Sequence, residues 1–232
     1  MGLSVAVIPA LNEIGTITEV VAAAANVVDR VIVIDDGSTD GTGDSARAAG
    51  ATVIRHPRNL GVGAAISSGL TRALELGADV MVQLDGDGQH DASYVPILVE
   101  QIRVGAADLV IGTRFELGFE MGLVRRLVLR SFAFPISARL GTHVSDPTSG
   151  FRAFNTLAAS TLAPVFPVKY LSDTVEVLYL AAEHNLRVAT VPVRMRERVA
   201  GKPSAGPLKS AAYTLRMVSI IVGHTFRRRV RG

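Results

Sequence analysis

The sequence contains no cysteine and no tryptophan among its 232 residues. The absence of cysteine excludes disulfide frameworks, zinc–thiolate sites, iron–sulfur clusters and cysteine nucleophiles, so a metal ion must use oxygen or imidazole ligands. Long apolar runs are also lacking, because the best, Val20–Val28 and Met217–Gly223, are far shorter than the ~20 residues of a membrane-spanning helix. Met1 leads directly into the strand-like segment Leu3–Ile8, which indicates no signal peptide. We therefore expect a cytoplasmic protein.

Charge is unevenly distributed along the chain, although the net charge is only +3. Residues 1–121 carry 7 basic and 16 acidic residues, whereas residues 122–232 carry 17 basic and 5 acidic residues. An acidic half joined to a basic half suggests two tasks, such as holding a cation and holding an anion. Aromatic residues make up only 5% of the chain and are not interleaved with the basic residues, which argues against nucleic-acid binding.

The alternation of short β-branched runs with helical segments predicts an α/β fold, with a mostly parallel central sheet flanked by helices. The expected strands are Leu3–Ile8, Arg30–Ile34, Thr52–Arg55, Val80–Leu84, Leu109–Thr113 and, in the less regular second half, Val188–Arg194. The expected helices are Ile14–Val28, Gly41–Ala49, Gly63–Leu76, Ser93–Val104 and Asp173–His184. A further short strand is expected within Asp146–Phe154. We expect one domain over residues 1–206, followed by a basic amphipathic helix and tail over residues 207–232.

The strongest local signal is the segment Gln83–His90, which reads Gln-Leu-Asp-Gly-Asp-Gly-Gln-His. Asp85 and Asp87 follow a buried strand, and ligands of parallel sheets bind at the carboxyl ends of the strands. Mg²⁺ commonly takes one or two carboxylates together with substrate phosphates, so these two residues could bridge a metal to a diphosphate, with Gln89 adding a neutral oxygen. The alternative is a hydrophilic turn in which the Asp residues cap the next helix. His90 would orient Asp87.

Two weaker polar clusters follow the first two expected strands. Ile34–Thr42 carries the paired carboxylates Asp35 and Asp36, one of which could accept a hydrogen bond from a ring N–H or a ribose hydroxyl. A tight turn leading into a helix explains the same residues, and both interpretations can hold. The segment Ile8–Glu13 ends the first strand, and an acidic residue that opens a helix is favoured by the helix dipole alone.

Taken in order, these clusters resemble the GT-A glycosyltransferases of family 2. The matching segments are Ile8–Glu13, Ile34–Thr42, Asn59–Gly69 and Asp85–His90. The downstream segment Asp146–Arg152, which reads Asp-Pro-Thr-Ser-Gly-Phe-Arg, is similar to the branch of dolichyl- and polyprenyl-phosphate sugar synthases typified by dolichol-phosphate mannose synthase. The resemblance extends from about Ser4 to about Gly201, which is most of the chain.

The resemblance implies a role for each matched residue on the donor side. The residues that would line the nucleoside pocket are Pro9, Leu11, Asn12, Glu13, Ile34 and Asp36. Asp85, Gly86 and Asp87 would contact the diphosphate, and Asp85, Asp87 and Gln89 would surround Mg²⁺ or Mn²⁺.

Three arginines, Arg114, Arg125 and Arg198, match family arginines that hold the donor or acceptor phosphate. Two departures from the family pattern affect the acceptor side: Leu129 stands where a polar residue is often found, and no lysine follows Ser204. The Gln-x-x-Arg-Trp signature of processive synthases is absent, so the resemblance implies a single sugar transfer.

The implied activity is an inverting, metal-dependent transfer of one sugar from a GDP- or UDP-sugar to a polyprenyl or dolichyl phosphate. A lipid monophosphate, with a second pKa of about 6, can attack the anomeric carbon without a strong general base. Two alternatives stay open. One is a glycan or protein hydroxyl acceptor, for which Asp146, Asp173 or Glu176 would serve as the base. The other is a non-catalytic subunit that binds nucleotide sugars.

Two basic segments predict contact with a membrane surface. Leu123–Phe132 alternates apolar and cationic faces, and Tyr213–Phe226 leads into the cluster Arg227–Arg231. Basic amphipathic helices favour anionic lipid interfaces, whereas burial of both helices in the core is the alternative. The expected location is the cytoplasm, peripheral at the cytoplasmic face of the membrane. A membrane-anchored partner and a homo-oligomer both remain open.

Overall fold

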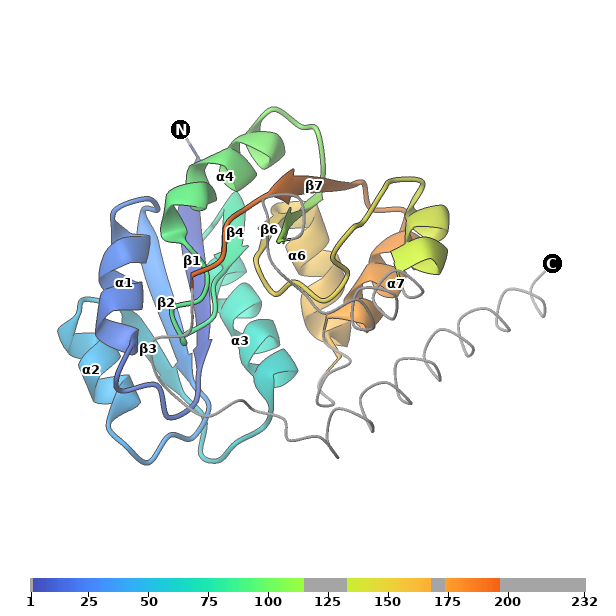
Figure 1. The fold of residues 1–232 in the computed structure, drawn as a ribbon. Helices are drawn as coiled ribbons and strands as arrows, with labels where there is room; N and C mark the ends of the chain where they lie inside the picture. Colours follow the sequence, from blue (N-terminus) through green and yellow to red (C-terminus); the bar gives the residue numbers. More distant parts are fainter. Residues whose placement is uncertain (1, 115–132, 168–173, 197–232) are drawn as a thin grey trace.

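The computed structural model describes residues 2–114, 133–167 and 174–196. These residues form a seven-stranded sheet in the order β3-β2-β1-β4-β6-β5-β7 (Figure 1). The strands are β1 (Ser4–Ala10), β2 (Arg30–Asp35), β3 (Thr52–Arg55), β4 (Val80–Gln83), β5 (Leu109–Thr113), β6 (Arg152–Asn155) and β7 (Val188–Pro192). All neighbours pair in parallel except β6, which is antiparallel to both β4 and β5. The mostly parallel α/β architecture expected from the sequence is confirmed.

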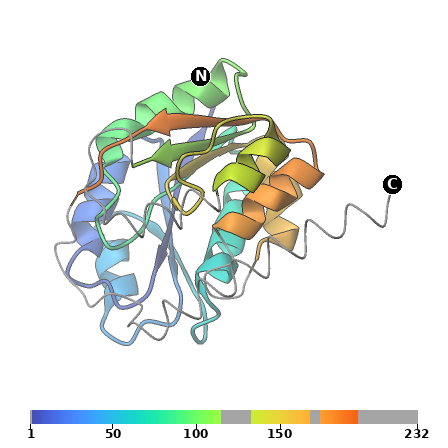
Figure 2. The ribbon, with the colours of Figure 1, turned by 45° about the vertical axis from the view of Figure 1, so that its right-hand side comes forward.

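Helices cover both faces of the sheet (Figure 1, Figure 2). One face packs against α1 (Ile17–Ala25), α2 (Thr42–Ala48) and α4 (Val95–Arg103), the last preceded by the single turn η1 (Ala92–Tyr94). The other packs against α3 (Val62–Glu75), α6 (Thr156–Leu162) with the turn η3 (Ala163–Val165), α7 (Val175–Glu183) and helical residues 133–140. Alternate residues of β1 enter the two cores, because successive strand side chains point to opposite faces.

The expected strands of the first half are all present, with ends that differ from the expected ones by at most two residues. Helix α6 was not expected. Its start could have been recognised from Asn155, whose Oδ1 accepts a hydrogen bond from the N–H of Ala158 at 2.8 Å and so caps the helix. The antiparallel insertion of β6 between β4 and β5 was not expected either, because a short, mostly buried strand carries no signal of its direction.

The segments expected to contact a membrane, Leu123–Phe132 and residues 207–232, lie outside the described residues. Within the ranges that the structure describes, no helix combines the length and the apolar character needed to cross a bilayer.

Candidate active site

The candidate site lies at the carboxyl edge of the parallel strands. The pairing of β1 with β4 ends at Val7 and Gln83, whereas β1 continues beside β2 as far as Ala10. Pro9 lies in this extension, on the side that faces β4, where β4 has already ended. The N–H that Pro9 lacks would therefore have had no partner in the sheet at this point. The chain that follows β4 turns across this end of β1, where Gly86 lies against Pro9 and Ala10.

The loops that follow β1 and β2 are joined by hydrogen bonds between backbone and side chains. Asn12 donates its N–H to Ser38 Oγ and accepts at Oδ1 from the N–H of Thr39, both at 3.0 Å. Glu13 donates its N–H to Thr42 Oγ1 at 2.8 Å. Asn12 adopts φ 56°, a left-handed conformation that Asn tolerates better than most residues. Two residues of the expected nucleoside pocket, Asn12 and Glu13, thus belong to one rigid rim.

Asp40 completes this rim at the start of α2. Its Oδ1 accepts from the N–H (3.0 Å) and the hydroxyl (2.6 Å) of Thr42, and its Oδ2 accepts from the N–H of Ile14 (3.2 Å). Burial raises the pKa of Asp40, but these hydrogen bonds favour the ionised form and leave the pKa below its usual value. The rim therefore carries a fixed negative charge at neutral pH.

Asp36 holds the loop that follows β3 against the end of β2. Its buried carboxylate lies 2.7 Å from Nδ1 of His56 and accepts from the N–H groups of Leu60 (2.9 Å) and Gly61 (2.8 Å). The second ring nitrogen of His56 lies 3.0 Å from Ser68 Oγ on α3. These contacts give Asp36 a structural task, and its expected contact with a nucleoside stays a prediction.

Asp35 forms the tight turn that the sequence indicated as an alternative. Its Oδ1 accepts from the N–H of Ser38 at 2.8 Å, and its Oδ2 lies 3.4 Å from Nε of Arg55. Ile34, one residue earlier, is buried in β2, whereas Leu11, in the loop that follows β1, is exposed. The expected nucleoside residues therefore come from two neighbouring loops, with Pro9 and Ile34 beneath them.

The Asp85–Asp87 turn is seated on the end of β1. Thr16, at the start of α1, donates its hydroxyl to the carbonyl oxygen of Gly86 at 2.7 Å. A Cβ on Gly86 would lie 3.2 Å from the carbonyl oxygen of Pro9, so glycine permits this close approach. Asp87 is 7% exposed and accepts at Oδ1 from the N–H of Gln89 at 3.0 Å, whereas the side chain of Asp85 is 40% exposed.

His90 positions Asp85 rather than Asp87, which corrects the expectation from the sequence. Its Nδ1 accepts a hydrogen bond from the N–H of Asp85 at 2.9 Å, so the proton of the neutral ring lies on Nε2. That nitrogen is 3.5 Å from Asp85 Oδ2. The ring stacks on Phe151 with 5.0 Å between centroids, so packing fixes the orientation of the imidazole and, through it, that of Asp85.

Arg114, at the end of β5, is held by the buried side chain of Asp146. The Nε–Oδ2 distance is 2.6 Å and the Nη2–Oδ1 distance is 3.1 Å, so the pair is bidentate. Arg114 Nη2 also donates to Thr148 Oγ1 at 2.9 Å. The structure thus places one expected phosphate-binding arginine at the carboxyl edge. The other two, Arg125 and Arg198, lie outside the described residues.

The carboxylates of the Asp85–Asp87 turn supply oxygen ligands, which are the type that a hard divalent cation binds. Within the described ranges, no cluster of three or more His, Cys, Asp or Glu side chains could hold a metal alone. Asp85 and Asp87 offer oxygen ligands, and Mg²⁺ usually combines one or two carboxylates with water and substrate phosphates. A Cβ on Gly150 would lie only 3.3 Å from each carboxylate oxygen of Asp85, so the glycine leaves that carboxylate uncovered.

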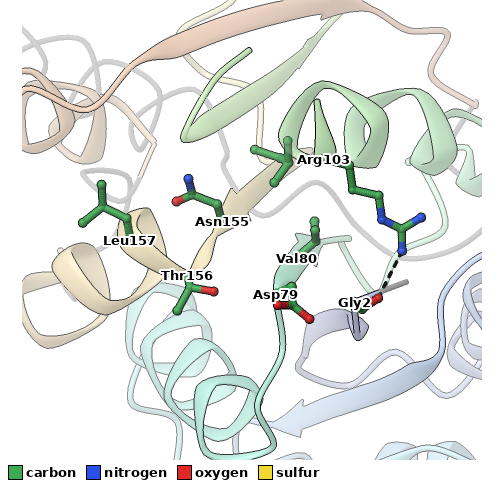
Figure 3. A pocket seen from close by; sticks show the side chains of 8 residues that line it. Gly2, Asp79, Val80, Arg103, Asn155, Thr156 and Leu157 are labelled. Carbon is green, nitrogen blue, oxygen red and sulfur yellow. Dashed lines mark hydrogen bonds between the residues drawn. The ribbon is translucent and has the colours of Figure 1, made fainter. Parts of the chain in front are cut away.

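A shallow pocket at the opposite, amino edge of the sheet involves none of the residues expected to act (Figure 3). Its polar groups are used within the protein: Arg103 Nη2 donates to the carbonyl oxygen of Gly2 at 3.3 Å, and Asp79 accepts from the N–H of Leu3 at 2.7 Å. We therefore keep the carboxyl edge as the candidate site.

We expect Thr16→Val to weaken Mn²⁺ binding roughly tenfold, because residues that orient metal ligands typically contribute about 10- to 100-fold to affinity. The substitution preserves shape but leaves the carbonyl of Gly86 without its donor, at a cost of about 1–3 kcal/mol. Calorimetric titration with Mn²⁺ measures the affinity, and urea unfolding measures the stability. Thr16→Ser keeps the hydroxyl and serves as the control; equal affinities in all three proteins would contradict the role of Thr16.

Comparison with known proteins places these observations in a family context. The model of the family described as Glycosyl transferase family 2 matches residues 5–162 of the chain. UDP-N-acetylglucosamine–dolichyl-phosphate N-acetylglucosaminyltransferase of Methanococcus voltae is 30% identical over 209 residues, which cover 81% of this chain and 83% of that protein. Undecaprenyl-phosphate mannosyltransferase of Micrococcus luteus is 32% identical over 208 residues, which cover 84% of each chain.

A solved structure shows the same fold with ligands bound. Glucosyl-3-phosphoglycerate synthase of Mycobacterium tuberculosis, crystallised with Mn²⁺, uridine diphosphate and glucosyl-3-phosphoglycerate, superposes with a TM-score of 0.76. The sequences are 25% identical, and the match covers 96% of this chain and 80% of that chain.

Proposed function

The chain belongs to glycosyl transferase family 2, and from this premise we propose that it transfers one sugar from a nucleotide sugar to a polyprenyl phosphate, with inversion at the anomeric carbon. The resemblance drawn from the sequence is thereby confirmed at the level of the family and of a glycosyltransferase activity. The observation that carries the finer proposal is the similarity to two relatives, each matched over more than four fifths of its length, whose names specify a polyprenyl- or dolichyl-phosphate substrate.

On the donor side, the rim built from the β1 and β2 loops binds the nucleoside of a UDP- or GDP-sugar. Pro9, Leu11, Asn12, Glu13, Ile34 and Asp36 line this pocket. Asp85 and Asp87 hold Mg²⁺ or Mn²⁺ against the diphosphate, with Gln89 beside them. When bound, the ion supplies positive charge that stabilises the departing nucleoside diphosphate. The solved neighbour, crystallised with both Mn²⁺ and uridine diphosphate, supports this assignment.

On the acceptor side, arginines bind phosphate. Asp146 and Thr148 fix the orientation of Arg114 at the end of β5, and Arg125 and Arg198 complete the set. A phosphate oxygen of the acceptor attacks the anomeric carbon, and the bond from that carbon to the β-phosphate oxygen of the donor breaks. The acceptor dianion carries no proton to remove above its second pKa of about 6, so this reaction needs no general base on the protein.

The tail that follows the catalytic domain serves to bring the enzyme to its lipid substrate. Residues 1–206 form the catalytic domain. The basic tail, residues 207–232, contacts the cytoplasmic face of the membrane, where its arginines favour anionic lipid.

Assays with a panel of donors and acceptors test the proposal. The purified protein is incubated with UDP-glucose, UDP-N-acetylglucosamine or GDP-mannose and a short polyprenyl phosphate. We expect sugar to enter the lipid extract in a form that mild acid releases, EDTA to stop the reaction, and Mg²⁺ or Mn²⁺ to restore it. 3-Phosphoglycerate and oligosaccharides serve as comparison acceptors. Transfer to these acceptors alone would contradict the lipid assignment, and turnover that is insensitive to EDTA would contradict the metal.

A further inference from the structure

Gln83, the last residue of β4, places the nitrogen of its side-chain amide beside the carboxylate of Asp85. A Cβ on Gly150 would lie 3.3 Å from Gln83 Nε2 and 3.3 Å from both carboxylate oxygens of Asp85. The amide nitrogen and the carboxylate therefore border the same small space next to Gly150. The side chain of Asp85 is 40% exposed, so this space belongs to the candidate site.

Nε2 of Gln83 is a hydrogen-bond donor that the described part of the protein does not use. The residue is only 2% exposed, and Nε2 meets no acceptor among the described residues. Nε2 keeps contact with solvent, since only Oε1 of this amide is both buried and unpaired. An amide N–H that is almost enclosed has little access to water and gains from a fixed acceptor. A ligand can meet this amide through its nitrogen.

Glycine at position 150 keeps the space beside Nε2 open. Gly150 does not adopt a positive φ, so its backbone conformation does not require glycine. The next residue, Phe151, is fully buried and stacks on His90, which holds this wall of the space in place. The consequence of glycine here is therefore the room that its missing side chain leaves between Gln83 and Asp85.

A ligand in this space must offer a hydrogen-bond acceptor, because an amide nitrogen only donates. Phosphate oxygens are the strongest acceptors in the proposed reaction, and an N–H that meets an ionised oxygen forms a charge-assisted bond. The carboxylate of Asp85 alone repels an anion, so phosphate binds there together with the divalent cation of the proposed function. The donor diphosphate and the acceptor phosphate both carry such oxygens.

We infer that Gln83 Nε2 donates a hydrogen bond to a phosphate oxygen bound beside Asp85. The inference rests on the proposed function and adds an uncharged donor to its charged groups. On an oxygen of the leaving diphosphate, negative charge grows as the bond to the anomeric carbon breaks, so the hydrogen bond strengthens in the transition state. On an oxygen of the acceptor phosphate, negative charge falls during attack, so the hydrogen bond serves binding.

The variant Gln83→Met tests this contact, because methionine keeps the length of the side chain and removes the donor. Calorimetry measures the affinity for Mn²⁺ alone, for UDP or GDP with Mn²⁺, and for a short polyprenyl phosphate. We expect the affinity for one of the two phosphate ligands to fall roughly tenfold, as for a lost hydrogen bond to a charged group. Affinity for Mn²⁺ alone and the melting temperature stay unchanged. Met81→Leu, on the same face of β4, is the matched control.

Kinetics of transfer identify the phosphate that Gln83 contacts. Contact with the leaving diphosphate lowers kcat about 100-fold in Gln83→Met and leaves KM for the acceptor unchanged. Contact with the acceptor phosphate raises its KM roughly tenfold and leaves the affinity for the nucleotide unchanged. Wild-type affinities and kinetics in Gln83→Met would overturn the inference. Weaker binding of Mn²⁺ alone would also overturn it, since Gln83 would then act only by positioning Asp85.

Gly150→Ala provides a second test if Gln83→Met does not fold. The added methyl group fills the space beside Nε2, so we expect the affinity for the same phosphate ligand to fall at least tenfold. Wild-type affinity in Gly150→Ala would overturn the inference. Absence of nucleoside diphosphate binding to the wild-type protein would instead overturn the proposed function, and the inference with it.

Discussion

Replacing Asp87 by asparagine is expected to lower the rate of sugar transfer by roughly 10³-fold, a loss typical of removing a group that stabilises charge in the transition state. Asparagine retains the oxygen that accepts the hydrogen bond from the N–H of Gln89, so the turn keeps its shape. Only the negative charge is lost. The substitution therefore tests whether that charge holds the cation that neutralises the leaving diphosphate.

The measurement compares initial rates of transfer at saturating donor and acceptor, with urea unfolding to show that stability is preserved. Asp91→Asn is the matched control, because Asp91 lies four residues further along the same loop and accepts from the N–H of Ser93 and from Arg196. We expect this control to keep its rate within about threefold, as for a surface ion pair of small energetic weight. A rate for Asp87→Asn equal to that of Asp91→Asn would remove Asp87 from the mechanism.

The layers of the fold could be predicted from the sequence because the signals are local. The buried runs of β1, β2 and β4 are four to seven residues long and each is followed by polar residues. Since the carboxyl ends of parallel strands share one edge, the positions of Asp35, Asp36, Asp85 and Asp87 on that edge followed directly. The direction of β6 could not be predicted with equal force, because it depends on which neighbours the chain finds, whereas the start of helix α6 was missed although Asn155 offers a local capping signal.

The contacts that position the site could not be predicted, because they join residues far apart in the chain. Thr16 and Gly86 are separated by 70 positions, and Arg114 and Asp146 by 32. No spacing rule connects such pairs, and a threonine near the start of an expected helix has no feature that distinguishes it from other threonines.

The contacts that position the charged groups have a common consequence for the chemistry. His90 fixes Asp85, Thr16 fixes the turn that carries Asp87, and Asp146 fixes Arg114. Within the described residues, the charged groups that are expected to face a phosphate or a metal, Asp85, Asp87 and Arg114, are thus held by partners in the protein. Such preorganisation lowers the cost of arranging charges when the reaction occurs.

Replacing Asp146 by asparagine is expected to destabilise the protein by about 2–3 kcal/mol and to lower transfer at least tenfold. Breaking a buried ion pair by removal of one partner costs about 3–5 kcal/mol. We expect a smaller cost, about 2–3 kcal/mol, because the side chain of Arg114 is 21% exposed and partly hydrated, whereas that of Asp146 is fully buried. Asparagine retains an acceptor for Thr148 but leaves the guanidinium without its carboxylate, so Arg114 loses its fixed orientation toward the phosphate.

Urea unfolding at neutral pH measures the loss of stability, and assays at saturating donor with varied acceptor measure the loss of transfer. Asp44→Asn is the control, because Asp44 pairs with Arg47 at 2.8 Å with both side chains largely exposed, and such pairs contribute about 0–1 kcal/mol. The two variants remove the same type of ion pair and differ chiefly in burial. If Asp146→Asn were as stable and as active as Asp44→Asn, the Arg114–Asp146 pair would have no part in holding the acceptor phosphate, and the acceptor site would have to lie elsewhere.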